Sequence, residues 1–336
     1  MSNSAFGIDL GTSNIKIYNR SDDTILVEKN MIAIENKNTL FAYGDSAFEM
    51  YEKAPGNIHI SYPLSNGVIA DIKNMELLIK YFLNDLTRSN LKPADYYIAV
   101  PTDVTEVEKR AFYDLIRDAG IKARKIMVVE KAVADGLGLD IDVKNSQGVL
   151  IVNVGFDTTE ISILSLGGIV LSRLIKVGGQ KFDDAIRAAV RREFSLIIGG
   201  KTAENVKMAL SDLEKSGQGA VVYGRDIVTG LPVERELPTK LIDDSLIEHF
   251  HTIIDNIKVI LERTPPELAA DIYRHGIYLT GGASQVNHLS ELMQKGTGLK
   301  VNVSENPVTS VALGISKIIK DDNYKSVAYS IEGMSK

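Results

Sequence analysis

Residues 6–18 read FGIDLGTSNIKIY, and residues 149–164 read VLIVNVGFDTTEISIL. In both stretches, β-branched residues flank a tight turn that contains Gly and Thr, a pattern that predicts a β-hairpin. The two turns align when Asp9 is placed on Asn153. The pattern therefore indicates an α/β protein made of two similar halves, with one hairpin from each half facing the other across a cleft.

The glycine in each turn, Gly11 or Gly155, suits contact with a phosphate group. A residue without Cβ lets the backbone approach phosphate oxygens closely and direct its N–H groups at them. Lys16 would add an ammonium group, and Asp9 would hold a magnesium ion through water. We assign phosphate binding to Gly11, Thr12, Ser13, Asn14 and Lys16 in the first hairpin and to Gly155, Phe156, Asp157, Thr158 and Thr159 in the second.

A third glycine turn occurs in YLTGGAS, residues 278–284, where a predicted strand over 276–280 ends. A Thr-Gly-Gly turn lets the backbone lie flat against a nucleoside, and the helix start that follows favours anions. We assign Gly281, Gly282 and Ala283 to this contact. Three such turns in one chain predict a cleft for a nucleoside triphosphate, ATP or GTP, together with Mg²⁺.

The composition is that of a soluble globular protein, with 336 residues of which 44% are hydrophobic and 24% charged. The net charge of −6 argues against a broad basic surface of the kind that binds nucleic acid. The absence of cysteine excludes disulfides and thiolate chemistry. No apolar run approaches the roughly 20 residues that span a bilayer, and the start does not resemble a signal peptide, so we expect a cytoplasmic protein.

Predicted strands and helices alternate along the chain, as the α/β class requires. The helical segments are 75–86, 106–118, 182–194, 202–213 and 245–263, and the short strands are 96–100 and 126–129. Thr202 is the expected N-cap of the fourth helix. Polar, turn-rich insertions at about 29–69 and 181–237 predict two smaller subdomains, and the last stretch, 321–336, reads as a flexible tail.

The segment Gly199-Gly200-Lys201-Thr202 is similar to the end of a phosphate-binding P-loop. A P-loop requires another glycine at position 195, which is Ser195, and a strand-then-helix setting that the flanking residues lack. We therefore interpret this segment as the start of a helix.

These residues resemble the actin superfamily, and within it the MreB family, over about residues 6–320. The similar stretches outside the phosphate turns are PLSNGVIADIKNMELLIKYF (63–82), VPTDVTEVEKRA (100–111), VGGQKFDDAI (177–186), TAENVK (202–207), LERTPPELAADI (261–272) and NPVTSVALG (306–314). The resemblance implies an actin-like fold with four subdomains. They would be IA at 1–28, 70–146 and 312–336, IB at 29–69, IIA at 147–180 and 238–311, and IIB at 181–237.

The resemblance also implies roles for the residues of the cleft. The two hairpins would be the phosphate-1 and phosphate-2 loops, and the third glycine turn would be the adenosine loop. Glu204 and Lys207 match a helix pair that reaches the ribose and the adenine, and their i, i+3 spacing places them on one helix face. The same spacing would also suit a surface salt bridge. Gly178 and Gly179, in the matching VGGQKF segment, complete the nucleotide-binding set.

One departure from the family pattern concerns the residue that orients the attacking water. The superfamily usually has Glu or Gln there, whereas in MVVEKAVADGLG (127–138) the matching residue is Lys131, with Glu130 beside it. An ammonium group does not accept a proton from water, although it does neutralise charge on the γ-phosphate. An alignment shifted by one residue would make Glu130 catalytic, so both residues are candidates.

Further departures lie in the second hairpin. Asn153 replaces an Asp that helps to hold hydrated magnesium and the attacking water, and a neutral amide holds a cation only weakly. Phe156 and Asp157 replace two glycines, which places a negative charge towards the phosphates. With Thr159 as the remaining catalytic candidate, we expect a slow ATPase at most.

The resemblance implies protomers that stack head to tail into protofilaments, usually paired, at the inner face of the cell membrane. Such a cytoskeletal protein would act in cell shape and, in wall-less helical bacteria, in swimming. Membrane contact would depend on a partner or on the loop 87–96, with Leu91 as its apolar tip. The alternatives are a plasmid-segregating filament of the ParM type, which GTSNIK also resembles, and a small-molecule kinase of the same superfamily.

Overall fold

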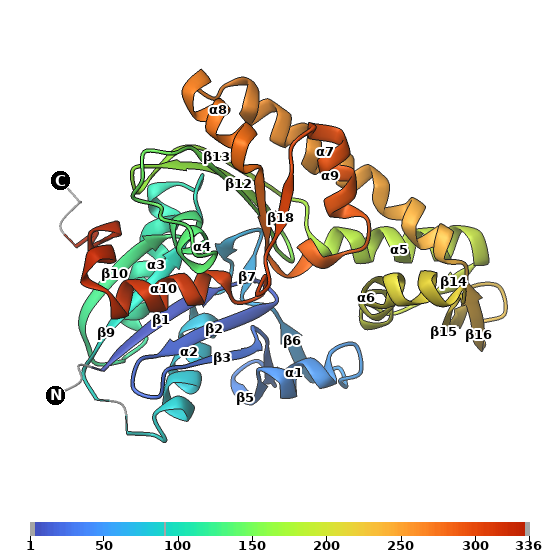
Figure 1. The fold of residues 1–336 in the computed structure, drawn as a ribbon. Helices are drawn as coiled ribbons and strands as arrows, with labels where there is room; N and C mark the ends of the chain where they lie inside the picture. Colours follow the sequence, from blue (N-terminus) through green and yellow to red (C-terminus); the bar gives the residue numbers. More distant parts are fainter. Residues whose placement is uncertain (1–3, 91, 333–336) are drawn as a thin grey trace.

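The computed structural model describes residues 4–90 and 92–332, which form two large sheets with the same strand pattern (Figure 1). In strand order, the first sheet is β19 (Ala328–Tyr329), β10 (Ala123–Glu130), β9 (Ala94–Val100), β1 (Ala5–Leu10), β2 (Asn14–Asn19) and β3 (Thr24–Lys29). The second is β13 (Gly168–Ile175), β12 (Thr159–Ser165), β11 (Val149–Val154), β17 (Ile277–Thr280) and β18 (Val301–Val303). In each sheet an antiparallel meander continues into two parallel strands, which confirms the predicted duplication.

The two predicted hairpins form in the same way. The Gly11 N–H donates to the Asn14 carbonyl at 3.1 Å, and the Gly155 N–H donates to the Thr158 carbonyl at 2.8 Å. A Cβ atom would lie 2.7 Å from the carbonyl oxygen at Gly11 and 3.0 Å from it at Gly155. Glycine is therefore needed in both turns because the chain folds back on itself closely.

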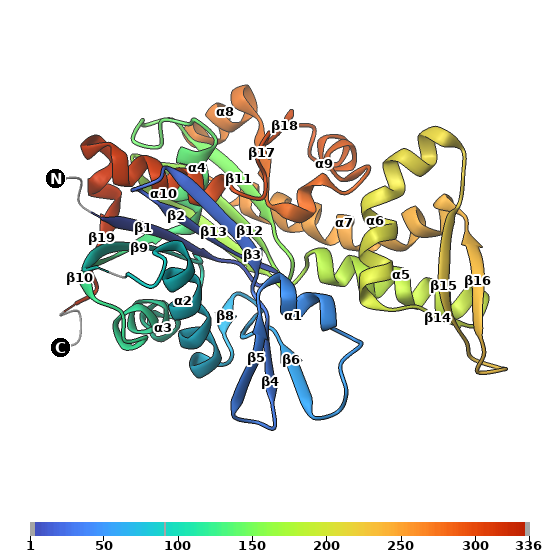
Figure 2. The same ribbon diagram turned by 90° about the horizontal axis from the view of Figure 1, so that it is seen from below.

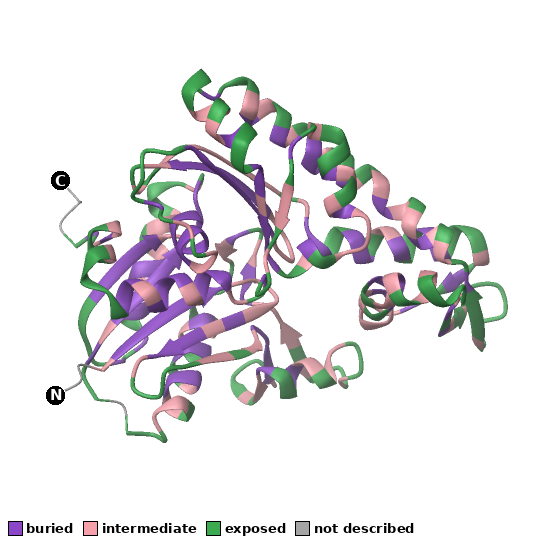
Figure 3. Ribbon diagram, in the orientation of Figure 1, coloured by how far each residue is buried: buried purple, intermediate pink, exposed green. Residues whose placement is uncertain are grey.

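Two helices join the sheets, α4 (Lys131–Gly138) and α10 (Ser310–Lys320). They cross at very short range, since a Cβ at Gly138 would lie 1.9 Å from the Ser310 carbonyl oxygen and one at Gly314 would lie 1.7 Å from that of Ala134. Their apolar side chains share one core cluster with residues of β10 and β11. Figure 3 shows these central strands and helices as mostly buried.

The remaining helices pack on the two large sheets, on one another or on the small sheets described below. They are α2 (Ile72–Leu86), α3 (Glu106–Asp118), α5 (Gly179–Phe194), α6 (Gly200–Ser216), α7 (Thr239–Glu262), α8 (Pro266–His275) and α9 (Leu289–Thr297). The five predicted helices are confirmed, with earlier starts for four of them. Thr202 as an N-cap is wrong, because α6 begins two residues before it with Gly199 as the cap.

Two small sheets project from the large ones (Figure 2). The first consists of β4 (Ile32–Glu35), β5 (Thr39–Tyr43) and β6 (Ile58–Ser61), with α1 (Asp45–Met50) beside it. The second consists of β14 (Leu196–Ile197), β15 (Ala220–Asp226) and β16 (Pro232–Leu237). Each sheet falls inside one of the predicted insertions, 29–69 and 181–237. The short strands β7 (Leu64–Ser65) and β8 (Val68–Ile69) lead back towards the cleft.

The flexible tail predicted over 321–336 is wrong as far as residue 332. The 3₁₀ helix η2 (Asp322–Val327) is followed by β19, which pairs with β10, and the side chain of Ile331 is buried. Leu91, the predicted membrane-contacting tip, lies outside the described residues. No helix in the described part of the chain combines the length and the apolarity needed to cross a membrane.

Candidate nucleotide-binding cleft

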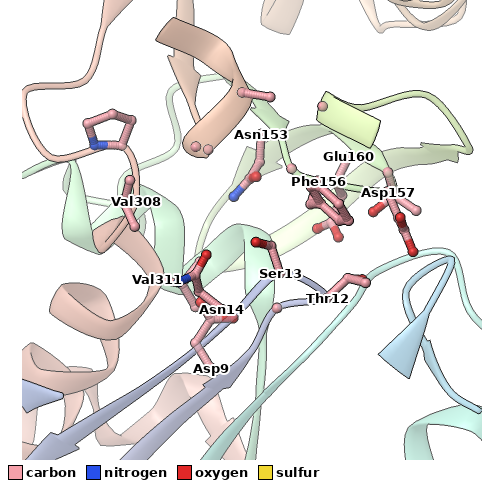
Figure 4. A pocket seen from close by; sticks show the side chains of 18 of the residues that line it. Asp9, Thr12, Ser13, Asn14, Asn153, Phe156, Asp157, Glu160, Val308 and Val311 are labelled. Carbon is pink, nitrogen blue, oxygen red and sulfur yellow. The ribbon is translucent and has the colours of Figure 1, made fainter. Parts of the chain in front are cut away.

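A cavity of about 300 Å³ lies between the two halves of the molecule. Of the predicted residues, it is lined by Asp9, Gly11, Thr12, Ser13, Asn14, Lys16, Lys131, Asn153, Gly155, Phe156, Asp157, Thr158, Gly179, Glu204, Lys207, Gly281, Gly282 and Ala283. Figure 4 shows side chains of the first turn opposite those of the second. Among the described residues, the lining does not include Glu130, Thr159 or Gly178.

The first turn is held rigidly at the floor of the cavity. The Lys16 Nζ donates to Asp9 Oδ2 at 3.1 Å, and the Asp9 side chain is almost fully buried. The Asn30 Nδ2 donates to the Gly11 carbonyl at 2.9 Å, which fixes the turn from behind. Asp9 and Lys16 therefore reach the cavity as a pair of opposite charges.

The second turn contacts the opposite half through the two residues that replace glycine. The Asn66 N–H donates to Asp157 Oδ2 at 2.9 Å, so this carboxylate forms a hydrogen bond with the opposite half of the molecule. The rings of Phe156 and Tyr62 pack with centroids 5.7 Å apart. These side chains bridge the two halves beside the cavity.

The structure separates the two candidates for the water-orienting position. Lys131 lines the cavity, whereas Glu130 Oε1 accepts hydrogen bonds from Lys109 Nζ at 2.9 Å and from the Tyr329 hydroxyl at 2.7 Å. The Glu130 carboxylate thus faces α3 and β19. Burial lowers the pKa of Lys131, but nearby carboxylates, among them Asp9, outweigh burial and raise it. Lys131 is therefore a cation beside the cavity.

Asn153 is tied to a buried carboxylate that the sequence did not single out. The Asn153 Nδ2 donates to Asp135 Oδ2 at 2.6 Å, and the Ser310 hydroxyl donates to Asp135 Oδ1 at 2.6 Å. Burial raises the pKa of Asp135 to about 6, although Lys131 opposes the rise. In the sequence, the feature that could have identified Asp135 is its position one helical turn after Lys131 within an otherwise apolar segment.

Glu160 also lines the cavity and was likewise missed by the sequence analysis. Its side chain lies on β12, with only 5% of the residue exposed, and Oε2 accepts from the Thr102 N–H at 3.3 Å. Burial raises the pKa of Glu160 to about 7. The signal was a carboxylate within a run of strand-forming residues. The preceding Thr159 is turned away, because its hydroxyl donates to the Val177 carbonyl at 2.7 Å.

The third glycine turn and the helix pair close the other end of the cavity. Gly281 has a φ of +92°, and a Cβ there would lie 2.3 Å from the Val154 carbonyl oxygen. Lys207 Nζ forms a salt bridge with Asp183 at 2.7 Å and donates to the Gly179 carbonyl at 3.2 Å. Glu204 lies 3.9 Å from Lys29 Nζ. This end combines an uncovered backbone with polar groups, which suits a nucleoside.

The segment that resembles a P-loop forms a contact between the two small sheets' subdomains. Glu52 accepts hydrogen bonds from the Gly200 N–H at 2.9 and 3.2 Å, so a residue next to α1 caps the N-terminus of α6. Lys29 and Lys201 lie 4.1 and 4.2 Å from the centroid of the Phe48 ring. The predicted helix start is confirmed. Its contacts with Glu52 and Phe48 join the two small subdomains at the mouth of the cleft.

Gly178 supports the second turn from behind. It precedes α5, and a Cβ there would lie 2.6 Å from the carbonyl oxygens of Gly155 and Phe156. The Gly179 N–H donates to the Gly155 carbonyl at 3.0 Å. Both glycines therefore position the turn, and Gly179 also reaches the cavity.

Comparison with known proteins identifies relatives over almost the whole chain. The MreB/Mbl protein family model matches residues 3–326. The cell shape-determining protein Mbl of Bacillus subtilis (strain 168) is 36% identical over 313 residues, which cover 92% of this chain and 93% of Mbl.

The structural comparison agrees. MreB5 of Spiroplasma citri bound to ADP has a TM-score of 0.89 at 34% identity, covering 97% of this chain and 98% of MreB5, and its AMPPNP-bound form has the same score at 33% identity. A MamK double helical filament has a TM-score of 0.77 at 20% identity, covers 95% and 99% of the two chains, and shares the fold.

Proposed function

Because the chain belongs to the MreB/Mbl family, we propose that it is a nucleotide-dependent, filament-forming bacterial actin that acts in cell shape. The observation that carries the proposal is the cavity between two duplicated hairpins, in an actin-like fold that MreB5 shares over nearly its full length. This full-length match favours the proposal over a plasmid-segregating filament or a small-molecule kinase. We include in this proposal a role in the helical shape of the cell and in swimming.

The proposed ligand is ATP or GTP with Mg²⁺. Support comes from MreB5, which is bound to ADP in one structure and to AMPPNP in another. The cavity supplies backbone N–H groups and hydroxyls for phosphates, and Asp9 supplies a carboxylate that would hold hydrated Mg²⁺ through water. Mg²⁺ usually keeps several waters and binds through one or two carboxylates and the phosphates, so this donor set fits the ion. The ion would neutralise charge on the phosphates.

The proposed partners are further copies of the same chain, stacked head to tail into protofilaments that pair. We place these filaments in the cytoplasm, at the inner face of the membrane, with attachment through a partner or through the 87–96 loop. Support comes from family membership.

We further propose that hydrolysis is slow, because Lys131 and Asn153 replace two carboxylates. The test is phosphate release from Mg-ATP by the purified chain and by a variant carrying Lys131→Glu and Asn153→Asp. The variant also carries Asp135→Asn, since the new Asp would otherwise face Asp135 at 2.6 Å. A variant with Asp135→Asn alone is the matched control.

We expect phosphate release at least about tenfold faster in the triple variant than in the control, since a positioned base typically contributes 10²- to 10⁴-fold. Rapid release by the unmodified chain would contradict slow hydrolysis. Equal rates in the two variants would show that these substitutions do not limit the reaction.

A further inference from the structure

The catalytic candidates drawn from the sequence do not present an unpaired carboxylate to the cavity within residues 4–90 and 92–332. Lys131 is a cation, and Asn153 is a neutral amide bound to Asp135. Glu130 faces residues of α3 and β19, and the Thr159 hydroxyl is bonded to a carbonyl group. Any base that assists hydrolysis must therefore be another residue.

Glu160 meets the geometric requirement for that base. It is the second residue of β12 and lies two positions after Thr158 of the phosphate-binding turn. Its side chain therefore reaches the cavity at the end where the phosphates would bind (Figure 4). Oε2 is fixed by the Thr102 N–H. Oε1 is buried and has no hydrogen-bond partner among the described residues. A buried acceptor without a partner is costly, unless a ligand supplies the donor.

The charges around Glu160 are arranged to let it gain and lose a proton near neutral pH. Burial raises its pKa to about 7, Lys131 on α4 opposes this rise, and Asp135 on the same helix adds to it. A general base works best when its pKa lies near the operating pH. The carboxylate is therefore neither permanently ionised nor permanently neutral.

We propose that Glu160 accepts the proton of the water that attacks the γ-phosphate, and so takes over the task of the carboxylate missing at position 131. The water oxygen forms a bond to the γ-phosphorus as the bond to the bridging oxygen breaks, and that electron pair stays on the departing diphosphate. The water proton moves to Glu160 Oε1 and then to the released phosphate. Lys131 offsets negative charge on the γ-phosphate. The inference rests on the proposed binding of ATP.

The test measures phosphate release by the full chain with Mg-ATP, for the unmodified protein, Glu160→Gln and the exposed control Glu248→Gln. Nucleotide binding is measured separately with a fluorescent ATP analogue, so that failure to bind is distinguished from failure to hydrolyse. We expect Glu160→Gln to bind the analogue within about twofold of the unmodified chain and to lose phosphate release down to the rate without protein, a loss of about 100-fold or more where the rate permits. Glu248→Gln should keep the rate.

The dependence of the rate on pH separates a base from a residue that only holds Lys131 in place. In the unmodified chain, release should increase tenfold per pH unit below the pKa of Glu160 and level off above it. A structural role would leave the profile of Glu160→Gln parallel to that of the unmodified chain. If Glu160→Gln fails to bind the analogue, Glu160→Asp replaces it, because the shorter carboxylate should keep the pH dependence at a reduced rate.

Three results would overturn the inference. They are phosphate release by Glu160→Gln at the unmodified rate, no release by the unmodified chain above the blank despite bound nucleotide, and a pH-independent rate in Glu160→Asp. A loss confined to a Glu130→Gln variant would assign the base to Glu130 instead. Filament assembly is scored separately by sedimentation, so its failure leaves this result unaffected.

Discussion

Asp135 and Asn153 form a buried pair in which only one member carries a carboxyl group. Asn153→Asp would bring a second carboxyl to within about the 2.6 Å that now separates the Asn153 amide nitrogen from Asp135 Oδ2. Two carboxylates that share a site cannot both ionise easily, so one pKa rises. The folded variant would then hold a proton that the unfolded chain releases at lower pH.

That extra proton sets the direction in which the stability of the variant changes with pH. Since the folded state binds more protons than the unfolded state, the free energy of unfolding falls as pH rises through the elevated pKa. We expect Asn153→Asp to lose about 1–3 kcal/mol relative to the unmodified chain at pH 8 and less at pH 5. Urea unfolding of the nucleotide-free protein at both pH values measures this. The exchange variant Asp135→Asn with Asn153→Asp should recover most of the loss, whereas an equal loss at both pH values would contradict the account.

At this scale, the sequence predicted the residues of the turns but not the carboxylates beside them. Gly11, Gly155 and Gly281 are recognisable because backbone geometry forbids a Cβ there. Glu160 belongs to a strand with ordinary periodicity, so its approach to Lys131 on α4 depends on tertiary packing. Asp135 lies one helical turn after Lys131, but its hydrogen bond with Asn153 is likewise a tertiary contact. No local pattern records such a contact.

For the helix α6, the sequence predicted where the helix starts but not the residue that caps it. The helical spacing and the glycines before it indicated a helix start. The expected cap was Thr202, but the N-terminus is instead satisfied by Glu52, which lies 148 positions away from Gly200 in the sequence. Since a cap supplied by the opposite subdomain is a tertiary contact, only the folded structure shows it.

We expect Glu52→Ala to release bound nucleotide faster, because the mouth of the cleft loses a contact. Loss of a cap costs about 0.5–2 kcal/mol, which corresponds to a roughly 2- to 30-fold faster release if the whole loss falls on the closed state. The dissociation rate of a fluorescent ATP analogue measures this, with the exposed Glu49→Ala on neighbouring α1 as the matched control. The same dissociation rate in both variants would show that the Glu52 contact does not hold the cleft closed.

At the scale of the whole molecule, the duplicated sheets were predictable because two hairpins of the same pattern are visible in the sequence. The crossing of α4 and α10 was not, since the close contacts at Gly138 and Gly314 join segments far apart in the chain. Nor was the pairing of β19 with β10, which ties residues near the end of the chain to the strand preceding Lys131. The α4–α10 pair shares one core cluster with residues of β10 and β11 and so ties the two large sheets together, whereas the β19–β10 pairing belongs to the first sheet alone.

We propose that nucleotide in this cleft governs assembly of the chain into filaments. The most direct measurement is the fraction of purified protein that sediments at high speed with Mg-ATP, with Mg-ADP and without nucleotide. We expect the pelleted fraction with Mg-ATP to be large and well above the background fraction that pellets without nucleotide. Protein that stays in the supernatant under every nucleotide condition, although it binds the nucleotide, would contradict the claim.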